Sequence, residues 1–123
     1  MLDLIIKNGS CYIDKDLKDQ DISIKNGKII KIGKIDEEAK EFFDAKGLTV
    51  LPGCIDTQTH FREPGSTDTE DLHSGSRAAI VGGITSVFEM PNTNPPTSTK
   101  AEFQKKLDLA KNRMYCNYAF YFG

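Results

Sequence analysis

Residues 1–50 alternate short apolar runs with turn signals, a pattern typical of β-strands. The strands we expect are Leu2–Lys7, Ser10–Ile13, Asp21–Lys25, Lys28–Gly33 and Leu48–Leu51. Asn8-Gly9 predicts a turn, Asn26-Gly27 predicts a type I′ hairpin, and the charged stretch 14–21 predicts a loop. The pattern predicts a small antiparallel β unit that needs further strands from elsewhere, because so small a sheet is marginal alone.

A change of pattern at Pro52-Gly53 begins the second region, 51–123, in which strands and helices alternate. Strands are predicted at Cys54–Phe61, Ile84–Met90 and Met114–Phe122. Helices are predicted from a cap at Thr69 to Val81, and from Ser98 or Thr99 to about Arg113. The order strand, helix, strand, helix, strand indicates an α/β fold with a parallel sheet and right-handed crossovers.

Composition excludes several classes of protein. A net charge of −2 gives no attraction to nucleic acid or to an anionic membrane. No apolar run approaches the roughly 20 residues of a membrane helix, and the start lacks the features of a secretory signal, so we expect a cytoplasmic protein. The three cysteines form no C-x-x-C pair, so we expect buried free thiols rather than disulfides or a cysteine zinc site.

A polar cluster stands at the end of the first predicted parallel strand. Asp56, Gln58 and His60 alternate along it and so share one face. Such strands are usually apolar, so this face must meet a hydrogen-bond network or a metal. Arg62 follows directly and suits the bidentate binding of a carboxylate. From the residues alone, a structural histidine at 60 and an ordinary surface arginine at 62 remain open alternatives.

Two motifs in this region resemble those of the dihydroorotases, within the cyclic amidohydrolase superfamily. His60-Phe-Arg-Glu-Pro-Gly65 matches the family's H-F-R-E-P-G, and Met90-Pro-Asn-Thr-Asn-Pro95 matches its M-P-N-T-N-P. The opening at Leu4-Ile-Ile-Lys-Asn-Gly9 resembles the start of the superfamily's β-sandwich, and the ending at Tyr118–Gly123 resembles its third barrel strand.

The resemblance implies a β-sandwich portion at 1–50, followed by the first three βα units of a (β/α)8 barrel. It implies a zinc enzyme of pyrimidine synthesis that interconverts dihydroorotate and N-carbamoyl-aspartate. Carried over by position, His60 is a metal ligand, and Arg62 and Asn92 bind the substrate carboxylate. Partners in keeping with the resemblance are a second copy of the chain or aspartate carbamoyltransferase.

This sequence departs from the family at Gln58, where the family's D-x-H-x-H has its first histidine. An amide is a poorer zinc ligand than imidazole. Three interpretations stay open: a weaker or single-metal site, a glutamine that hydrogen-bonds a water on the metal, or a member that has lost catalysis and acts as a scaffold. His60, Arg62 and Asn92 are all present, which favours an active lineage.

The length is the second departure, because a complete (β/α)8 barrel needs about 250 residues and this chain has 123. The remaining ligands and the catalytic aspartate of the family would follow Gly123. We therefore expect a fragment that contains no catalytic residue and hydrolyses nothing alone.

Several neighbouring residues have less specific expectations. Glu63 either holds the loop or touches substrate, Asp56 orients a ligand or caps the backbone, and His73 is structural or surface. Thr93 and Asn94 are expected to shape the loop between the prolines. Allantoinase and dihydropyrimidinase are the rival enzymes of the same superfamily, and a non-catalytic scaffold is the rival from another class.

Overall fold

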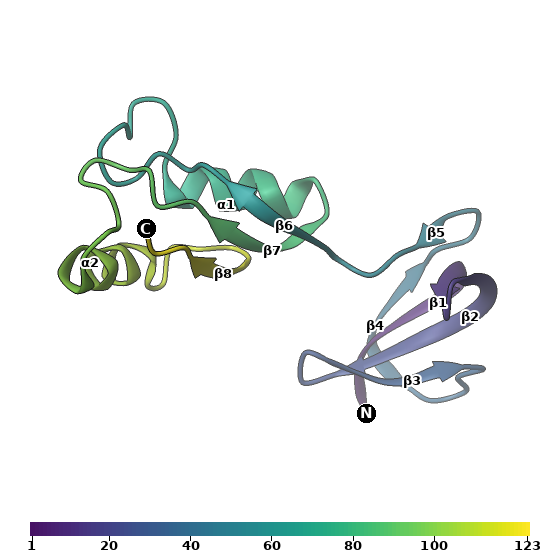
Figure 1. Cartoon of the computed structure of the whole chain (residues 1–123). Helices are drawn as coiled ribbons and strands as arrows, with labels where there is room; N and C mark the ends of the chain where they lie inside the picture. Colours follow the sequence, from purple (N-terminus) through teal and green to yellow (C-terminus); the bar gives the residue numbers. More distant parts are fainter. The chain divides into compact units, whose positions relative to one another are not determined.

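A computed structural model describes all of residues 1–123. The chain divides into unit 1, Met1–Pro52, and unit 2, Gly53–Gly123, and each is described by itself (Figure 1). Neither of the two helices is long and apolar enough to cross a membrane.

Unit 1 is a mixed sheet around a long central strand, β1 (Leu2–Ile13). On one side β2 (Asp16–Lys25) pairs antiparallel with β1, and β3 (Lys28–Gly33) pairs antiparallel with β2. On the other side β4 (Ala39–Asp44) and the two-residue β5 (Thr49–Val50) both run parallel to β1. The prediction of a purely antiparallel unit was therefore wrong. The connection after β3 carries the chain back to the start of β1, so the next strand runs in the same direction as β1.

The predicted loop at 14–21 is instead a turn and a strand. Asp14 and Lys15 have φ angles of 53° and 67°, which is the backbone of a two-residue hairpin turn. Because Ile13 then pairs with Asp16, the charged run becomes the exposed first half of β2. The predicted hairpin at Asn26-Gly27 is confirmed, with φ angles of 51° and 70°.

Asn8-Gly9 does not reverse the chain as predicted. Asn8 has a φ of 61°, and the β1–β2 ladder shifts register between Ile6 and Gly9. The dipeptide is thus a bulge inside β1, where a residue that tolerates the left-handed conformation is needed.

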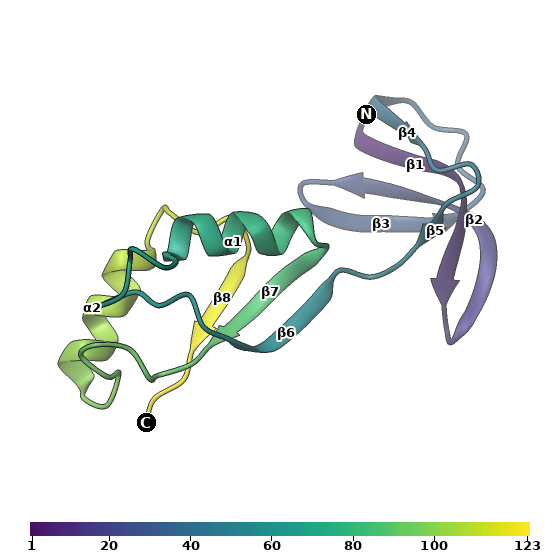
Figure 2. The ribbon, with the colours of Figure 1, turned by 90° about the horizontal axis from the view of Figure 1, so that it is seen from above.

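Unit 2 is a three-stranded parallel sheet with two helices. The strands β6 (Cys54–Thr59), β7 (Ile84–Glu89) and β8 (Asn117–Phe120) are hydrogen-bonded in that order. Helix α1 (Leu72–Val81) connects β6 to β7, and α2 (Lys100–Ala110) connects β7 to β8 (Figure 2). The predicted alternation of parallel strands and helices is confirmed.

The core of unit 2 lies between the helices and the sheet, and its buried members are Phe61, Leu72, Val87, Ala110, Cys116 and Phe120. The elements are shorter than predicted. Asp71, rather than Thr69, caps α1, because its carboxylate accepts a hydrogen bond from the Ser74 amide while the Ser74 side chain bonds back. Thr99 caps α2, which ends at Ala110.

Strand β6 is an edge strand, and most of its side chains are exposed. Among residues 1–123 only β7 pairs with it, which leaves exposed the strand that was predicted to be buried. Cys54 is exposed, contrary to expectation, whereas Cys11 and Cys116 are buried free thiols.

Helix α1 packs closely on the loop after β6, at the contact between Gly75 and Phe61. A Cβ built on Gly75 would lie 2.4 Å from Cδ1 of Phe61. We expect Gly75→Ala to lower the free energy of unfolding by about 1–3 kcal/mol, because the buried ring must shift. Gly82→Ala is the control: its Cβ would meet nothing nearer than 3.5 Å, and its φ is −81°. Equal denaturation midpoints for the two variants of the complete protein would contradict this packing.

Candidate functional site

The residues singled out in the sequence lie where β6 and β7 end. His60 directly follows β6, and Asn92 follows β7 by three residues. The two segments remain paired past the strands, because the Met90 amide donates to the Thr59 carbonyl at 2.9 Å. This end of a parallel sheet is where α/β enzymes place their active sites.

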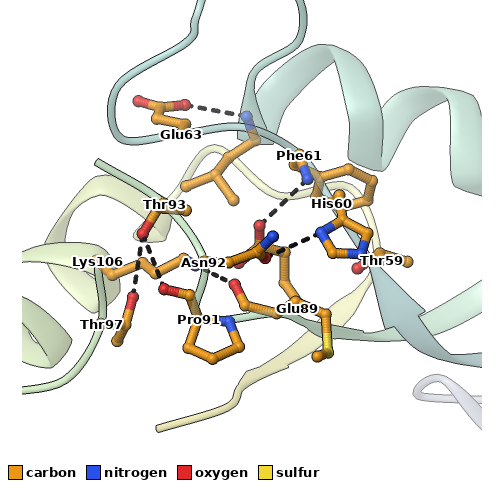
Figure 3. Close-up of polar contacts among 12 residues, drawn as sticks. Thr59, His60, Phe61, Glu63, Glu89, Pro91, Asn92, Thr93, Thr97 and Lys106 are labelled. Atoms are coloured by element: carbon orange, nitrogen blue, oxygen red, sulfur yellow. Dashed lines mark hydrogen bonds and ion pairs between the residues drawn. The ribbon is translucent and has the colours of Figure 1, made fainter. Parts of the chain in front are cut away.

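His60 and Asn92 are in direct contact, which the sequence did not predict (Figure 3). His60 Nδ1 lies 3.0 Å from Asn92 Oδ1. An amide oxygen can only accept, so Nδ1 is the donor in this contact, and in the neutral ring Nε2 is then the nitrogen that carries the lone pair. Fixing one ring nitrogen in this way is how proteins usually prepare the other for a metal. The geometry therefore suits His60 as a ligand through Nε2.

Gln58 and Asp56 do not complete a ligand set. Gln58 is exposed on β6, and the Asp56 carboxylate accepts from the Gln58 backbone amide at 3.0 Å. Asp56 is thus a backbone cap, one of its two expected roles. No group of three histidine, cysteine, aspartate or glutamate side chains in this chain could hold a metal ion. His60 fits a zinc centre as one ligand, and zinc needs three or four.

Arg62 lies in the left-handed conformation, with φ 62°, and is exposed. Its carbonyl accepts from the Ser66 amide at 2.9 Å, which closes the turn after β6. That turn is joined to the segment after β7, since the Asn94 amide donates to the Pro64 carbonyl at 3.0 Å. No carboxylate of the chain forms an ion pair with Arg62. The predicted role of Arg62 in binding a substrate carboxylate stays a prediction.

Glu63 holds the loop. Its carboxylate is buried and accepts two hydrogen bonds from Arg113, at 2.7 and 3.1 Å, and one from the Leu72 amide at 3.0 Å. Glu63 in turn raises the pKa of the Arg113 guanidinium above its usual range. With its oxygens occupied in this way, Glu63 joins the loop to the start of α1 and to the segment that follows α2.

Sequence reasoning missed a buried ion pair between Glu89, the last residue of β7, and Lys106 of α2. Their exposed fractions are 1% and 0%. Glu89 accepts from the Phe61 amide at 3.2 Å, and Lys106 donates to the Met90 carbonyl at 2.9 Å. Burial raises the pKa of Glu89, while Lys106 and then the Phe61 amide act in the opposite direction. The sequence did contain an indication that Lys106 is buried: it lies on the same helical face as the apolar residues Phe103 and Ala110.

Two further polar residues of the region, Thr93 and His73, contact other residues of the chain. The Thr93 hydroxyl donates to the Pro95 carbonyl at 2.9 Å and lies 3.3 Å from the Thr97 hydroxyl, so Thr93 shapes the loop after β7 as expected. His73 is exposed on α1, with its ring centre 5.0 Å from that of Tyr115.

Comparison with known proteins identifies the family. Residues 49–123 match the amidohydrolase family, and the chain belongs to it. Allantoinase of Escherichia coli (strain K12) is 45% identical over 113 residues, which are 91% of this chain and 25% of the relative. Members of this family usually depend on a metal.

Solved structures agree with this assignment. L-hydantoinase (dihydropyrimidinase) from Arthrobacter aurescens superposes with a TM-score of 0.91 at 35% identity, over 100% of this chain and 28% of that one. D-hydantoinase (dihydropyrimidinase) from Thermus sp. gives a TM-score of 0.80 at 29% identity, over 97% of this chain and 27% of that one. The chain spans about a quarter of the length of these relatives.

These relatives confirm the predicted fold, an N-terminal sheet followed by the beginning of a (β/α)8 barrel. They also confirm the cyclic amidohydrolase superfamily. The narrower expectation of a dihydroorotase receives no support from them, since the relatives are named allantoinase and hydantoinase, two of the rival enzymes.

The Glu63–Arg113 pair generates the second prediction. We expect Arg113→Met to destabilise the complete protein by about 1–3 kcal/mol, because a buried carboxylate loses its charged donor. Lys105→Met is the matched control, since Lys105 pairs with Glu102 on the exposed surface of α2; its cost should stay below about 0.5 kcal/mol. Urea unfolding measures both, and a harmless Arg113→Met would show that Glu63 does not depend on this partner.

Proposed function

We propose that the complete protein, of which these residues are a part, hydrolyses a cyclic amide with the help of a bound divalent metal, most simply zinc. The observation that carries this proposal is the contact between His60 Nδ1 and Asn92 Oδ1 at the ends of β6 and β7. Membership of the amidohydrolase family supports it. When bound, the metal would supply Lewis-acid chemistry at the ring carbonyl.

Each residue of this chain has a defined part in the proposal. His60 holds the metal through Nε2, and Asn92 keeps the ring in the required tautomer. Gln58 adds a weaker bond than imidazole or none. The remaining ligands and the group that moves the proton to the leaving nitrogen belong to residues outside this chain.

For the substrate, the relatives support a neutral cyclic ureide, of the type that their names allantoinase and hydantoinase indicate. A second candidate is dihydroorotate, a ring that bears a carboxylate. The observation that favours it is Arg62, an exposed guanidinium without an intramolecular partner, two residues after His60. Bidentate binding of a carboxylate is the task for which arginine is best suited.

The metal site is tested by removing the proposed ligand. We expect His60→Ala to weaken zinc binding to the metal-free complete protein by about 100-fold. Loss of a residue that only orients a metal ligand weakens binding by about 10- to 100-fold, and loss of the ligand itself should cost at least as much. His73→Ala, the only other histidine, serves as the control and should bind zinc as the wild type does. Calorimetric titration with zinc measures both. A wild type that binds no zinc, with Gln58→His failing to create binding, would favour a non-catalytic scaffold, such as a partner of aspartate carbamoyltransferase.

The substrate is tested by assaying the complete protein on allantoin, hydantoin, dihydrouracil and dihydroorotate. If the ring carries a carboxylate, Arg62→Met should raise KM about 10- to 100-fold, the equivalent of one charge-assisted hydrogen bond. Arg62→Lys should recover part of this loss because it keeps the charge. If a neutral ring is the substrate, Arg62→Met should change KM by less than about threefold. Turnover of allantoin or hydantoin alone would exclude dihydroorotate.

A further inference from the structure

The amide of Phe61 lies at a point where the sheet no longer satisfies it. Strand β6 ends at Thr59, and Arg62 takes the left-handed conformation, so the chain turns away from β7. Phe61 is nevertheless buried, with an exposed fraction of 8%. A buried N–H needs an acceptor. The Glu89 carbonyl faces the other side of β7, where it accepts from the Tyr121 amide at 3.0 Å, and the Met90 carbonyl accepts from Lys106. The Glu89 side chain supplies the missing acceptor.

Lys106 performs the corresponding task on the neighbouring segment. Its ammonium pairs with Glu89 and donates to the Met90 carbonyl, two residues before Asn92. The ion pair is thus bonded to both segments of the candidate site, on one side next to His60 and on the other close to Asn92 (Figure 3). Buried ion pairs are weak stabilisers compared with apolar side chains of similar size. Stability alone therefore does not account for two charges in this place.

We propose that Glu89, neutralised by Lys106, is a positioning residue: its carboxylate fixes the Phe61 amide and thereby the backbone from which His60 and Arg62 project. This inference rests on the proposed function in so far as His60 holds a metal. For the Phe61 amide, what matters in Glu89 is the acceptor oxygen it presents; Lys106 balances the charge of that carboxylate and, separately, donates to the Met90 carbonyl.

Two double variants separate the acceptor from the charge. Glu89→Gln with Lys106→Met removes both charges and keeps an acceptor for the Phe61 amide. Glu89→Leu with Lys106→Met also removes both charges but leaves that amide without an acceptor. The two variants share the change at Lys106, so they differ only in the group facing Phe61.

The readouts are the zinc affinity of the metal-free complete protein, by calorimetry, and hydrogen exchange of the Phe61 amide. Both are measured well below the unfolding temperature of each variant. We expect the glutamine variant to bind zinc within about threefold of the wild type and to keep the Phe61 amide protected. The leucine variant should bind zinc about 10- to 100-fold more weakly, as when a group that orients a ligand is lost, and its Phe61 amide should exchange faster.

The inference would be overturned if the two variants had the same zinc affinity and the same exchange rate at the Phe61 amide. It would also be overturned if the glutamine variant lost as much zinc affinity as the leucine variant. If the wild type itself binds no zinc, the proposed function fails, and exchange at Phe61 still decides the inference. In that case, exchange of the Phe61 amide that is faster in the leucine variant but not in the glutamine variant would support the inference.

Discussion

Two charges buried beneath the ends of β6 and β7 constrain the rest of unit 2. A carboxylate and an ammonium with exposed fractions of 1% and 0% are tolerated only as a pair with further hydrogen bonds. Glu89 and Lys106 meet this requirement by bonding to Phe61 and to the Met90 carbonyl. Helix α2, strand β7 and the loop after β6 are thus held in one arrangement, and the two segments that it joins carry His60 and Asn92.

The sequence was sufficient for the order of elements in unit 2, because apolar periodicity and the glycine and proline signals mark each of them. It was less informative for unit 1. Asp14-Lys15 does not resemble a hairpin turn, and the pairing of β4 with β1 joins residues far apart along the chain. The exposure of β6 was not predicted, because the burial of a strand depends on which strands pair with it, and in this structure only β7 does.

For the candidate site, the motifs predicted which residues take part, and the structure shows how these residues contact one another. His60 and Asn92 were assigned to metal and to substrate separately, and only the fold brings Nδ1 and Oδ1 within 3.0 Å. Glu63 looked equally suited to a substrate or a structural role until Arg113, fifty residues later, was found at its carboxylate. Pairs of this kind escape sequence patterns because each partner alone resembles an ordinary surface charge. The proposed choice between a neutral ring and a carboxylate-bearing ring depends on Arg62, which has no ion-pair partner in this chain.

The contact between Phe61 and Gly75 has a consequence for how this region can evolve. The ring of Phe61 lies against the bare backbone of α1, so positions 61 and 75 share one fixed volume. A larger residue on the helix is compatible with the fold only together with a smaller one on the loop. Because Phe61 stands between His60 and Arg62, a substitution on the helix at position 75 also affects the backbone that carries these two residues. Among distant relatives the two positions should therefore change together, the size gained at one matching the size lost at the other.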